Sequence, residues 1–324
     1  MNQEIINWLT NLNADRSHPW PDEVRGQAPH KPFLLLSILD GVEQGWISDN
    51  RIELNQPLIE MFFEYWNSMM GKDRITTIAL PFYHMQSEPF WKLHYKEGKE
   101  EYKSSPSLGG LTDRVEHAEM DEILFTLFDD PDERNAIRSL LITTYFSEEA
   151  ATQVAKISRF NYQAYNYSMQ LESIAAEPFR IDHTDEAGIK YRVSKTQVRD
   201  AGFSKTVRKA YRYTCAVCRS RVVTQGGSTL VDGAHIIPRS RSNNDDPRNG
   251  LALCKTHHWM FDHFMLTIQP DYRLLLSKWL KEEQNEVKSL WDLNKKPILL
   301  PDMESFHPAQ QALEIHLEKF KGVQ

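Results

Sequence analysis

The sequence predicts an α+β protein with a helix-rich mixed N-terminal domain, a partly helical connector, and a small C-terminal domain of two strands and a helix. Three observations support this prediction. Apolar residues recur at helical spacing over much of the first 146 residues. All three cysteines fall within 40 residues of one another in the C-terminal half, with Lys and Arg gathered around them. At 324 residues, the chain has room for about two domains.

The N-terminal domain is expected to span residues 1–146. An apolar run at 33–39 predicts a short buried helix, and apolar and aromatic residues at helical spacing predict a second helix at 58–66. Strand and loop pieces are expected at 75–93. Further helices are expected at 108–128 and 136–146, separated by a turn that contains Pro131.

A connector is expected at residues 147–194, followed by a C-terminal domain at 195–324. The first half of the connector is compatible with a helix, whereas its second half is polar and rich in turn residues. The C-terminal domain should begin with a basic helix at 198–211. A strand near 229–237, a polar loop, a second strand near 249–254 and a short helix at 255–264 should then follow in that order.

The composition is that of a soluble globular protein, with 40% apolar and 26% charged residues. No run of about 18 apolar residues exists, so no membrane span is expected. The first 20 residues lack a basic stretch followed by an apolar stretch and do not resemble a secretory signal. A cytoplasmic protein with no membrane partner is therefore expected.

Charge is distributed unevenly along the chain. The net charge is −7, but residues 199–255 contain eleven Lys or Arg and four Asp or Glu, a local charge of +7 that leaves −14 for the remainder. A local basic surface is what a phosphate backbone meets, so contact with DNA is expected there, with a solvated basic face as the alternative. The residues concerned are Arg208, Lys209, Arg212, Arg219, Arg239, Arg241 and Arg248.

Two short motifs supply cysteine and histidine at the spacing of a metal site. Cys215 and Cys218 are three positions apart, as are Cys254 and His257. Three thiolates and one imidazole suit tetrahedral zinc, and four protein ligands leave no open position, so this ion should be structural. The alternative is a set of buried cysteines beside an unrelated histidine, but two paired half-sites favour zinc.

A second group of residues suits phosphodiester hydrolysis. His235 can act as a general base, because a neutral histidine accepts protons near neutral pH. His258 and Asp262 lie four residues apart on a predicted helix, so both can hold one divalent ion. Asp232 can add a carboxylate to that ion. Asn249 can hydrogen-bond the loop and fix the tautomer of the histidine.

These motifs together resemble the HNH, or ββα-metal, nuclease family. The resemblance covers about 55 residues: Cys-x2-Cys, Ala-His-Ile-Ile-Pro, Asn-Gly-Leu-Ala-Leu-Cys and His-His-x3-Asp occur in order. It implies that His235 is the general base, Asn249 the orienting residue and His258 a ligand of a catalytic Mg²⁺ or Mn²⁺. It implies Asp262 as a second ligand of that ion. The sequence differs from the family at two positions: His257 replaces the usual fourth zinc thiolate, and Ala234 replaces an acidic residue or histidine.

The N-terminal segments resemble the sulfur-binding domain of modification-dependent (type IV, McrA-like) HNH restriction endonucleases. The resemblance rests on the segments His-Lys-Pro-Phe-Leu-Leu-Leu from 30, Pro-Phe-Tyr-His-Met from 81 and Phe-Trp-Lys-Leu from 90. It implies recognition of phosphorothioate DNA. His30 and Lys31 would contact the backbone, while Pro81, Phe82, Tyr83 and His84 would line the recognition loop. Ser105 and Pro106 would form the opposite wall, although the family often has arginine at the position of Ser105.

The sequence therefore predicts a modification-dependent endonuclease that acts on double-stranded DNA, with structural Zn²⁺ and catalytic Mg²⁺ or Mn²⁺. Each chain carries one HNH motif, so a double-strand break requires either a homodimer or sequential nicking. Several alternatives stay open. The N-terminal domain could read methylated bases or unmodified DNA, and the nuclease could act on RNA. The protein could also be an inactive, zinc-stabilised DNA-binding protein.

Overall fold

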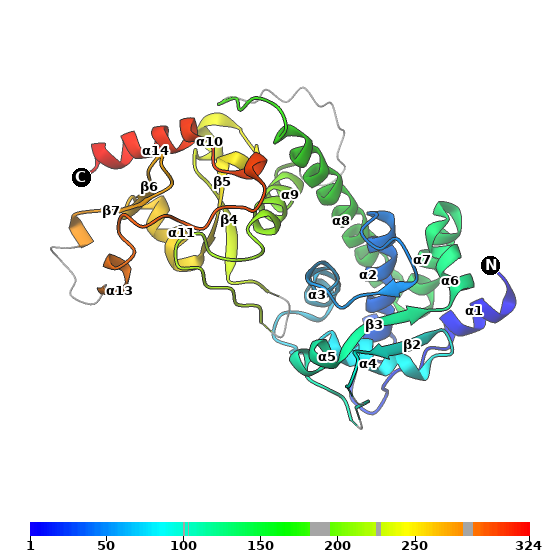
Figure 1. Cartoon of the computed structure of the whole chain (residues 1–324). Helices are drawn as coiled ribbons and strands as arrows, with labels where there is room; N and C mark the ends of the chain where they lie inside the picture. The colour runs from blue at the N-terminus through cyan, green and yellow to red at the C-terminus, as the bar shows by residue number, and fades with distance from the viewer. Residues whose placement is uncertain (100, 103, 182–194, 225–227, 281–287) are drawn as a thin grey trace. The chain divides into compact units, whose positions relative to one another are not determined.

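The structure is a computed structural model of the chain, and it describes residues 1–99, 101–102, 104–181, 195–224, 228–280 and 288–324. It confirms the predicted α+β class, because many helices accompany three small antiparallel sheets (Figure 1). Two compact units are present. The first contains residues 1–162; the second contains residues 163–223 and 229–324, and each has its own apolar core.

The first unit packs helices against a three-stranded sheet with strand order β1-β3-β2. All pairs in this sheet are antiparallel, and Leu93 of β2 lies opposite Ala118 of β3. The elements are α1 (Gln3–Thr10), η1 (Asp22–Val24), α2 (His30–Glu43), β1 (Arg51–Ile52), α3 (Gln56–Met70), α4 (Ala79–His84), η2 (Met85–Ser87), β2 (Trp91–Tyr95), α5 (Leu108–Arg114), β3 (Val115–Met120), α6 (Glu122–Asp129) and α7 (Pro131–Tyr145).

Helix α2 runs through the centre of this unit. Residues 31–42 are all buried, so the helix is enclosed on every side and shows no amphipathic stripe. The ring of Phe33 stacks on Tyr65 of α3 at 5.9 Å and on Phe146 at 5.3 Å. The predicted helices at 33–39 and 58–66 are thus confirmed as parts of α2 and α3.

Two predictions for this unit are wrong. A single helix was expected at 108–128, but β3 interrupts it, because its side chains pair across the ladder with β2. Residues 79–84, expected as strand or loop, form the short helix α4. Pro81 is tolerated there because it lies in the first helical turn, where its missing N–H is not required.

Helix α8 (Glu148–Ile174) occupies the first part of the predicted connector, and the division between the two compact units falls within it, after Tyr162. Its 27 residues confirm that the first half of the connector is helical. The polar stretch at 182–194 lies outside the described residues.

The second unit has the predicted order of strand, loop, strand and helix. Strands β4 and β5 are antiparallel, with His235 opposite Gly250 and Val231 opposite Cys254. The elements are α9 (Lys195–Ala210), β4 (Val231–His235), α10 (Arg239–Ser242), η3 (Pro247–Asn249), β5 (Gly250–Cys254), α11 (Lys255–Asp262), β6 (Leu266–Ile268), β7 (Leu274–Leu276), α13 (Lys288–Trp291), η5 (Glu304–Phe306) and α14 (Gln310–Gly322).

Helix α9 packs closely against β4 and β5, and Gly250 permits this approach. A Cβ atom at Gly250 would lie 2.5 Å from Cγ2 of Val207 and 3.0 Å from Cζ of Phe203. Any larger residue would displace the side chains of α9. Glycine at the start of β5 therefore keeps Phe203 next to β4.

Helix α14 buries His316 against the short helix α11. The imidazole stacks on Phe261 at 3.8 Å with an interplanar angle of 4°, and its Nδ1 bonds to Oγ1 of Thr267 at 2.8 Å. Burial lowers the pKa of His316 to about 4. The C-terminal helix thus supports the face of α11 that points into the core.

The pKa of His316 predicts an acid-labile second unit. In the unfolded chain this histidine takes up a proton near its ordinary pKa of 6.5, whereas in the folded chain it stays neutral until about pH 4. The free energy of unfolding should therefore fall as pH decreases between these values, by about 3 kcal/mol for this group. Urea unfolding of the His316→Gln variant should show a weaker pH dependence than the wild type; an identical dependence would contradict the assignment.

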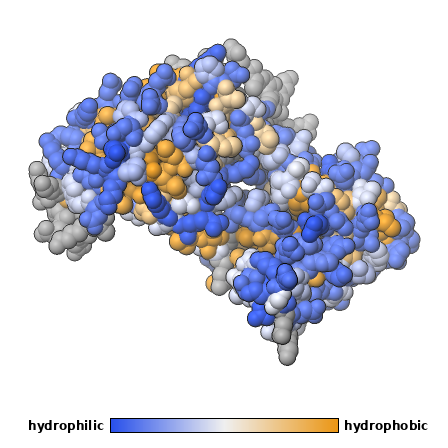
Figure 2. All heavy atoms as spheres, viewed as in Figure 1, coloured by the Kyte–Doolittle hydropathy of each residue, from blue (hydrophilic) through white to orange (hydrophobic). Residues whose placement is uncertain are grey.

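Figure 2 shows a mainly hydrophilic face with hydrophobic atoms grouped over part of the second unit. Within the described part of the chain, no helix is long and apolar enough to cross a membrane.

Candidate active site and metal centre

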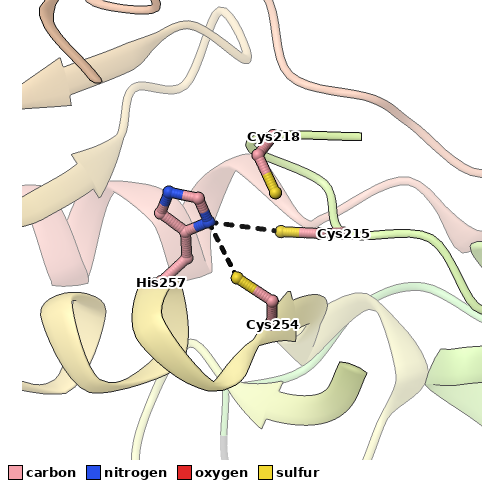
Figure 3. Close-up of side chains that lie close together, drawn as sticks. All are labelled: Cys215, Cys218, Cys254 and His257. Carbon is pink, nitrogen blue, oxygen red and sulfur yellow. Dashed lines mark hydrogen bonds between the residues drawn. The ribbon is translucent and has the colours of Figure 1, made fainter. Parts of the chain in front are cut away.

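Three thiols and one imidazole meet between the turn that follows α9 and the N-terminus of α11 (Figure 3). The ligand atoms of Cys215, Cys218, Cys254 and His257 all lie within 4.8 Å of one another. Nδ1 of His257 is 3.0 Å from Sγ of Cys254 and 3.5 Å from Sγ of Cys215. Neighbouring ligands of a tetrahedral zinc ion are about 3.5–3.8 Å apart, so this arrangement has the size of a closed metal site.

One thiol of the cluster readily loses its proton. Hydrogen bonds from Cys215 and then from His257 hold the pKa of the Cys254 thiol well below its usual value, despite partial burial. A thiolate is the form that binds metal. The four residues predicted from spacing are thus brought together. Among the described residues they form the one group of three or more His, Cys, Asp or Glu that is compact enough to hold an ion.

His235 lies at the end of β4, with its ring fixed on two sides. Phe203 of α9 stacks on it at 3.7 Å with an interplanar angle of 8°. Nε2 lies 3.0 Å from Oδ1 of Asp245, and the side chain is 18% exposed. One edge of the imidazole is therefore held while the side chain still reaches solvent.

Asp245, which sequence reasoning did not identify, is the buried partner of His235. Its other oxygen, Oδ2, accepts a hydrogen bond from Nε of Arg199 at 2.7 Å and from Oη of Tyr167 at 2.8 Å. Burial raises the pKa of Asp245, but the hydrogen bonds from His235 and Tyr167 and the charge of Arg199 outweigh it and lower the pKa overall. No spacing rule connects residues 167, 199, 235 and 245, so only the fold reveals the group.

Asn249 joins the segment that follows His235 to the loop before β5. It is fully buried; Oδ1 accepts from the N–H of Ile237 at 2.8 Å, and Nδ2 donates to the carbonyls of Ile237 at 3.1 Å and Asn244 at 2.9 Å. It therefore holds the backbone, as the sequence predicts. The expectation that it also fixes the histidine tautomer is wrong, because Asp245 is the residue that bonds the imidazole.

These contacts predict a large loss of stability for Asn249→Ala. The substitution leaves three buried backbone groups without a partner, and each costs about 1–3 kcal/mol. The free energy of unfolding should fall by at least about 3 kcal/mol in urea titration. A loss below about 1 kcal/mol would show that the loop does not depend on this amide.

His258 lies between the two predicted carboxylates. Nε2 is 3.5 Å from Oδ2 of Asp262, and Nδ1 is 3.8 Å from Oδ2 of Asp232. Asp232 lies two residues before Ala234 and thus on the same face of β4, where it also pairs with Lys255. A hydrogen bond from His258 lowers the pKa of Asp232 to about 2, and the same bond raises the pKa of His258. Because the carboxylates approach different nitrogens of the imidazole, the three residues do not converge on one point.

The basic residues predicted as phosphate contacts differ in their surroundings. Lys209 pairs with Glu172, Arg212 with Asp302 and Arg239 with Asp200. Arg248 is tied to Asp246 and to the carbonyl of Ile174, and Arg208 bonds Thr229. Arg219 and Arg241 are exposed and form no ion pair with any residue that the structure describes. The local charge of +7 therefore overstates the unbalanced positive charge.

The first unit contains a cavity of about 490 Å³ that gathers four of the residues predicted to read DNA. Its lining includes His30, Lys31, Pro81 and His84, and Ser105 bonds to His84. Phe82 does not line it, because this side chain is fully buried in the core. Tyr83 bonds the carbonyl of Tyr102, and Pro106 is buried.

The cavity lacks the unbalanced positive charge that would attract an anionic DNA backbone. Burial lowers the pKa of His30 to about 4, and burial followed by the charge of Lys31 lowers that of His84, so both are neutral at neutral pH. Lys31 is buried and paired with Glu88. The carboxylate of Asp15, whose pKa is lowered by hydrogen bonds from Ser17, also lines the cavity.

Comparison with known proteins addresses the second unit. Residues 215–269 match the family model described as HNH endonuclease. This match confirms the resemblance to HNH endonucleases. The matched segment contains all four residues of the Cys3His cluster together with His235, Asn249, His258 and Asp262.

A solved structure that matches is described as a modification dependent TagI restriction endonuclease. The match has 22% sequence identity and a TM-score of 0.30, and it spans 38% of each chain. None of the curated proteins compared with the chain matches it in sequence.

Proposed function

We propose that the protein is an endodeoxyribonuclease that hydrolyses phosphodiester bonds in double-stranded DNA with the help of a divalent metal ion. The observation that carries this proposal is the geometry of His235 inside the segment that matches the HNH model: a histidine held at one nitrogen and open to solvent. His258, with Asp232 and Asp262 on either side, supplies metal-binding groups in the same segment.

In this proposal His235 removes a proton from water, and the water oxygen forms a new bond to phosphorus. The ester P–O bond breaks, and the leaving oxygen takes a proton from solvent, which completes the hydrolysis. A bound Mg²⁺ or Mn²⁺ would stabilise the charge that develops on the phosphate oxygens. His258 and Asp262 would hold this ion, with Asp232 as a third ligand after a small rotation of the imidazole or a carboxylate.

The Cys3His cluster would hold Zn²⁺ and stabilise the fold. All four ligands come from the protein, so no position is open for substrate. Asn249 holds the backbone on both sides of the catalytic loop. Arg208 and Arg241 would contact phosphates, as would Lys209, Arg212 and Arg239 once their surface ion pairs open. Exposed pairs of this kind contribute about 0–1 kcal/mol, so DNA can replace them.

The first unit would direct the nuclease to modified DNA, and phosphorothioate is the favoured mark. Sulfur is larger and less strongly hydrated than oxygen and therefore tolerates apolar neighbours, which Leu80, Pro81 and Ala28 provide in the cavity. His30, Lys31, His84 and Ser105 would bond the flanking backbone, with Tyr83 and Pro106 holding the loop. Phe82 supports this loop from the core.

A methylated base is a second candidate ligand because of the charge in the cavity. Asp15 is an acceptor that repels an anionic phosphorothioate but suits the exocyclic amine of cytosine. The two neutral histidines add no attraction for an anion. Electrostatics therefore favours a neutral ligand, whereas the apolar wall and the motif favour sulfur.

Binding by the full-length His235→Ala protein distinguishes these candidates, because this variant should bind without cutting. Duplexes of one sequence would carry a phosphorothioate, a 5-methylcytosine or no modification. The proposal predicts preferential binding to the phosphorothioate duplex. Preferential binding to the methylated duplex would support recognition of a methylated base. Equal binding to all three duplexes would contradict modification-dependent recognition.

Cleavage products identify the substrate class and the assembly. We expect duplex DNA to be cut in preference to RNA of the same sequence. Preferential RNA cleavage would contradict the proposal, and binding without any cleavage would favour an inactive DNA-binding protein. Double-strand breaks whose rate rises with the square of protein concentration would indicate a homodimer.

A further inference from the structure

The carboxylate of Asp245 is the meeting point of three side chains from separate elements of the second unit. Tyr167 comes from α8, Arg199 from α9 and His235 from β4. Two of these, Tyr167 and Arg199, lie outside the segment 215–269 that matches the HNH model. We infer that Asp245 is a positioning residue for the catalytic histidine, and that Tyr167 and Arg199 complete this arrangement from outside the HNH segment. The inference rests on the proposed nuclease function.

The charge state of Asp245 follows from its partners. The side chains of Arg199 and Asp245 are 5% and 2% exposed, and an arginine stays protonated in proteins. A neutral carboxylic acid would leave that buried cation unbalanced, which is strongly unfavourable. Arg199 also donates to Oδ1 and to the backbone carbonyl of Asn243, so its guanidinium is fixed beside the loop. Asp245 is therefore an anion held in one orientation.

An anionic carboxylate accepts hydrogen bonds and cannot donate one. The 3.0 Å contact between Oδ1 of Asp245 and Nε2 of His235 therefore requires the proton on Nε2. In neutral His235 the lone pair is then on Nδ1, which is the only nitrogen free to accept a proton from water. Asp245 thus selects the tautomer that can act as a base.

The same contact supports the proton-transfer step. An O–H bond of water breaks, its proton moves to Nδ1, and the remaining oxygen forms the bond to phosphorus as the ester P–O bond breaks. His235 is then an imidazolium that donates from Nε2 to Asp245, and the opposite charges attract in a buried environment. The imidazolium afterwards returns the proton to solvent. Phe203, stacked on one ring face, keeps the imidazole plane fixed throughout.

A purely structural role for Asp245 is the main alternative, because the Asp245–Arg199 pair also fastens the loop to α9. Asp246 offers a matched control. It is the next residue, it is equally buried, and its carboxylate bonds Arg248 without a contact to His235. A loss of loop structure should affect both variants, whereas a loss of tautomer control should affect only Asp245→Asn.

The test compares Asp245→Asn with Asp246→Asn in the full-length, zinc-loaded protein, measured below the unfolding transition of each. Long-range ¹H–¹⁵N NMR of the imidazoles, with His235 assigned by His235→Gln, reports the tautomer directly. We expect Nε2–H in the wild type and in Asp246→Asn, and a mixed or reversed tautomer in Asp245→Asn. The cleavage rate of Asp245→Asn should fall about 10²–10⁴-fold, as for a lost orienting carboxylate.

Two results would overturn the inference: an Nδ1–H tautomer in the wild type, or an Asp245→Asn protein that keeps both the wild-type tautomer and a cleavage rate within threefold. If Asp245→Asn does not fold, the wild-type spectrum alone still decides. The tautomer is read without cleavage, so a wild-type protein that cuts no nucleic acid would contradict the proposed function while leaving this inference testable.

Discussion

Replacement of His235 by alanine is expected to reduce DNA cleavage by about 10²–10⁴-fold, because it removes the proposed general base. The side chain contacts Phe203 and Asp245 and is not one of the four residues of the Cys3His cluster. Zinc content should therefore stay at one ion per chain, and DNA binding should be retained. Single-turnover cleavage of a labelled duplex, with zinc measured in the same sample, checks both expectations.

His263→Ala is the matched control for this experiment. This histidine is exposed just after α11, where it stacks on Trp259 at 4.4 Å, and it has no contact with His235 or with the Cys3His cluster. Its replacement should leave the cleavage rate within about threefold of the wild type. A His235→Ala protein that cuts as fast as His263→Ala would show that another group is the base.

Replacement of Cys254 by serine should unfold the second unit. The metal-binding free energy of a structural zinc site is about 10–16 kcal/mol in zinc-finger peptides, whereas a whole domain is stable by about 5–15 kcal/mol. Loss of the ion, which follows from the loss of one of its four ligands, would therefore remove a free energy comparable to the whole stability of the unit. Thermal unfolding followed by near-UV circular dichroism should no longer show the transition of the second unit. The first unit should keep its own unfolding transition, because it has a separate core.

His258→Ala separates this structural effect from catalysis. His258 follows His257 directly, but it lies beside the carboxylates of Asp232 and Asp262 and is not part of the Cys3His cluster. This variant should bind zinc, unfold at the wild-type temperature within a few degrees and lose cleavage. A Cys254→Ser protein that keeps both transitions without zinc would contradict a structural metal, and so would a wild-type protein that purifies without one.

Short-range patterns predicted the metal cluster well. Cys-x2-Cys and Cys-x2-His each place two ligands on one local turn, and this geometry depends little on the rest of the fold. A backbone hydrogen bond from the N–H of Ala216 to the carbonyl of Ala252 in β5, at 2.8 Å, then holds the first pair beside the second. Helices α2 and α3 were predicted for a similar reason, since their apolar residues are close in sequence.

Contacts between distant residues could not be predicted in this way. Tyr167 and Arg199 reach Asp245 across 78 and 46 residues, and no periodicity connects them. Strand β3 was missed because its stability comes from its pairing with β1 and β2, whereas helical spacing around it suggested a continuous helix. Charge counting failed for a related reason. The count gave the net charge of residues 199–255, but it could not show which cations form ion pairs. Arg239 pairs with Asp200, and Arg212 pairs with Asp302.

At the cavity of the first unit, some residues of the sequence motif lie where they were expected and others do not. His30 and Pro81 lie at the cavity as the motif predicts, yet Phe82 is a core residue and Lys31 is neutralised by Glu88. Burial decides these differences, and a motif does not report burial. The identity of the mark thus depends on binding measurements, whereas the nuclease assignment depends on chemistry at His235.

Cleavage of supercoiled plasmid DNA by the full-length, zinc-loaded protein is the decisive measurement for the proposed nuclease. The reaction would be started by Mg²⁺ or Mn²⁺, on plasmid with and without phosphorothioate, beside His235→Ala. We expect nicked or linear product only when the divalent ion is added, formed faster on the modified plasmid, and no product with His235→Ala. Intact plasmid under every condition, from a folded protein that still binds DNA, would contradict the proposed function.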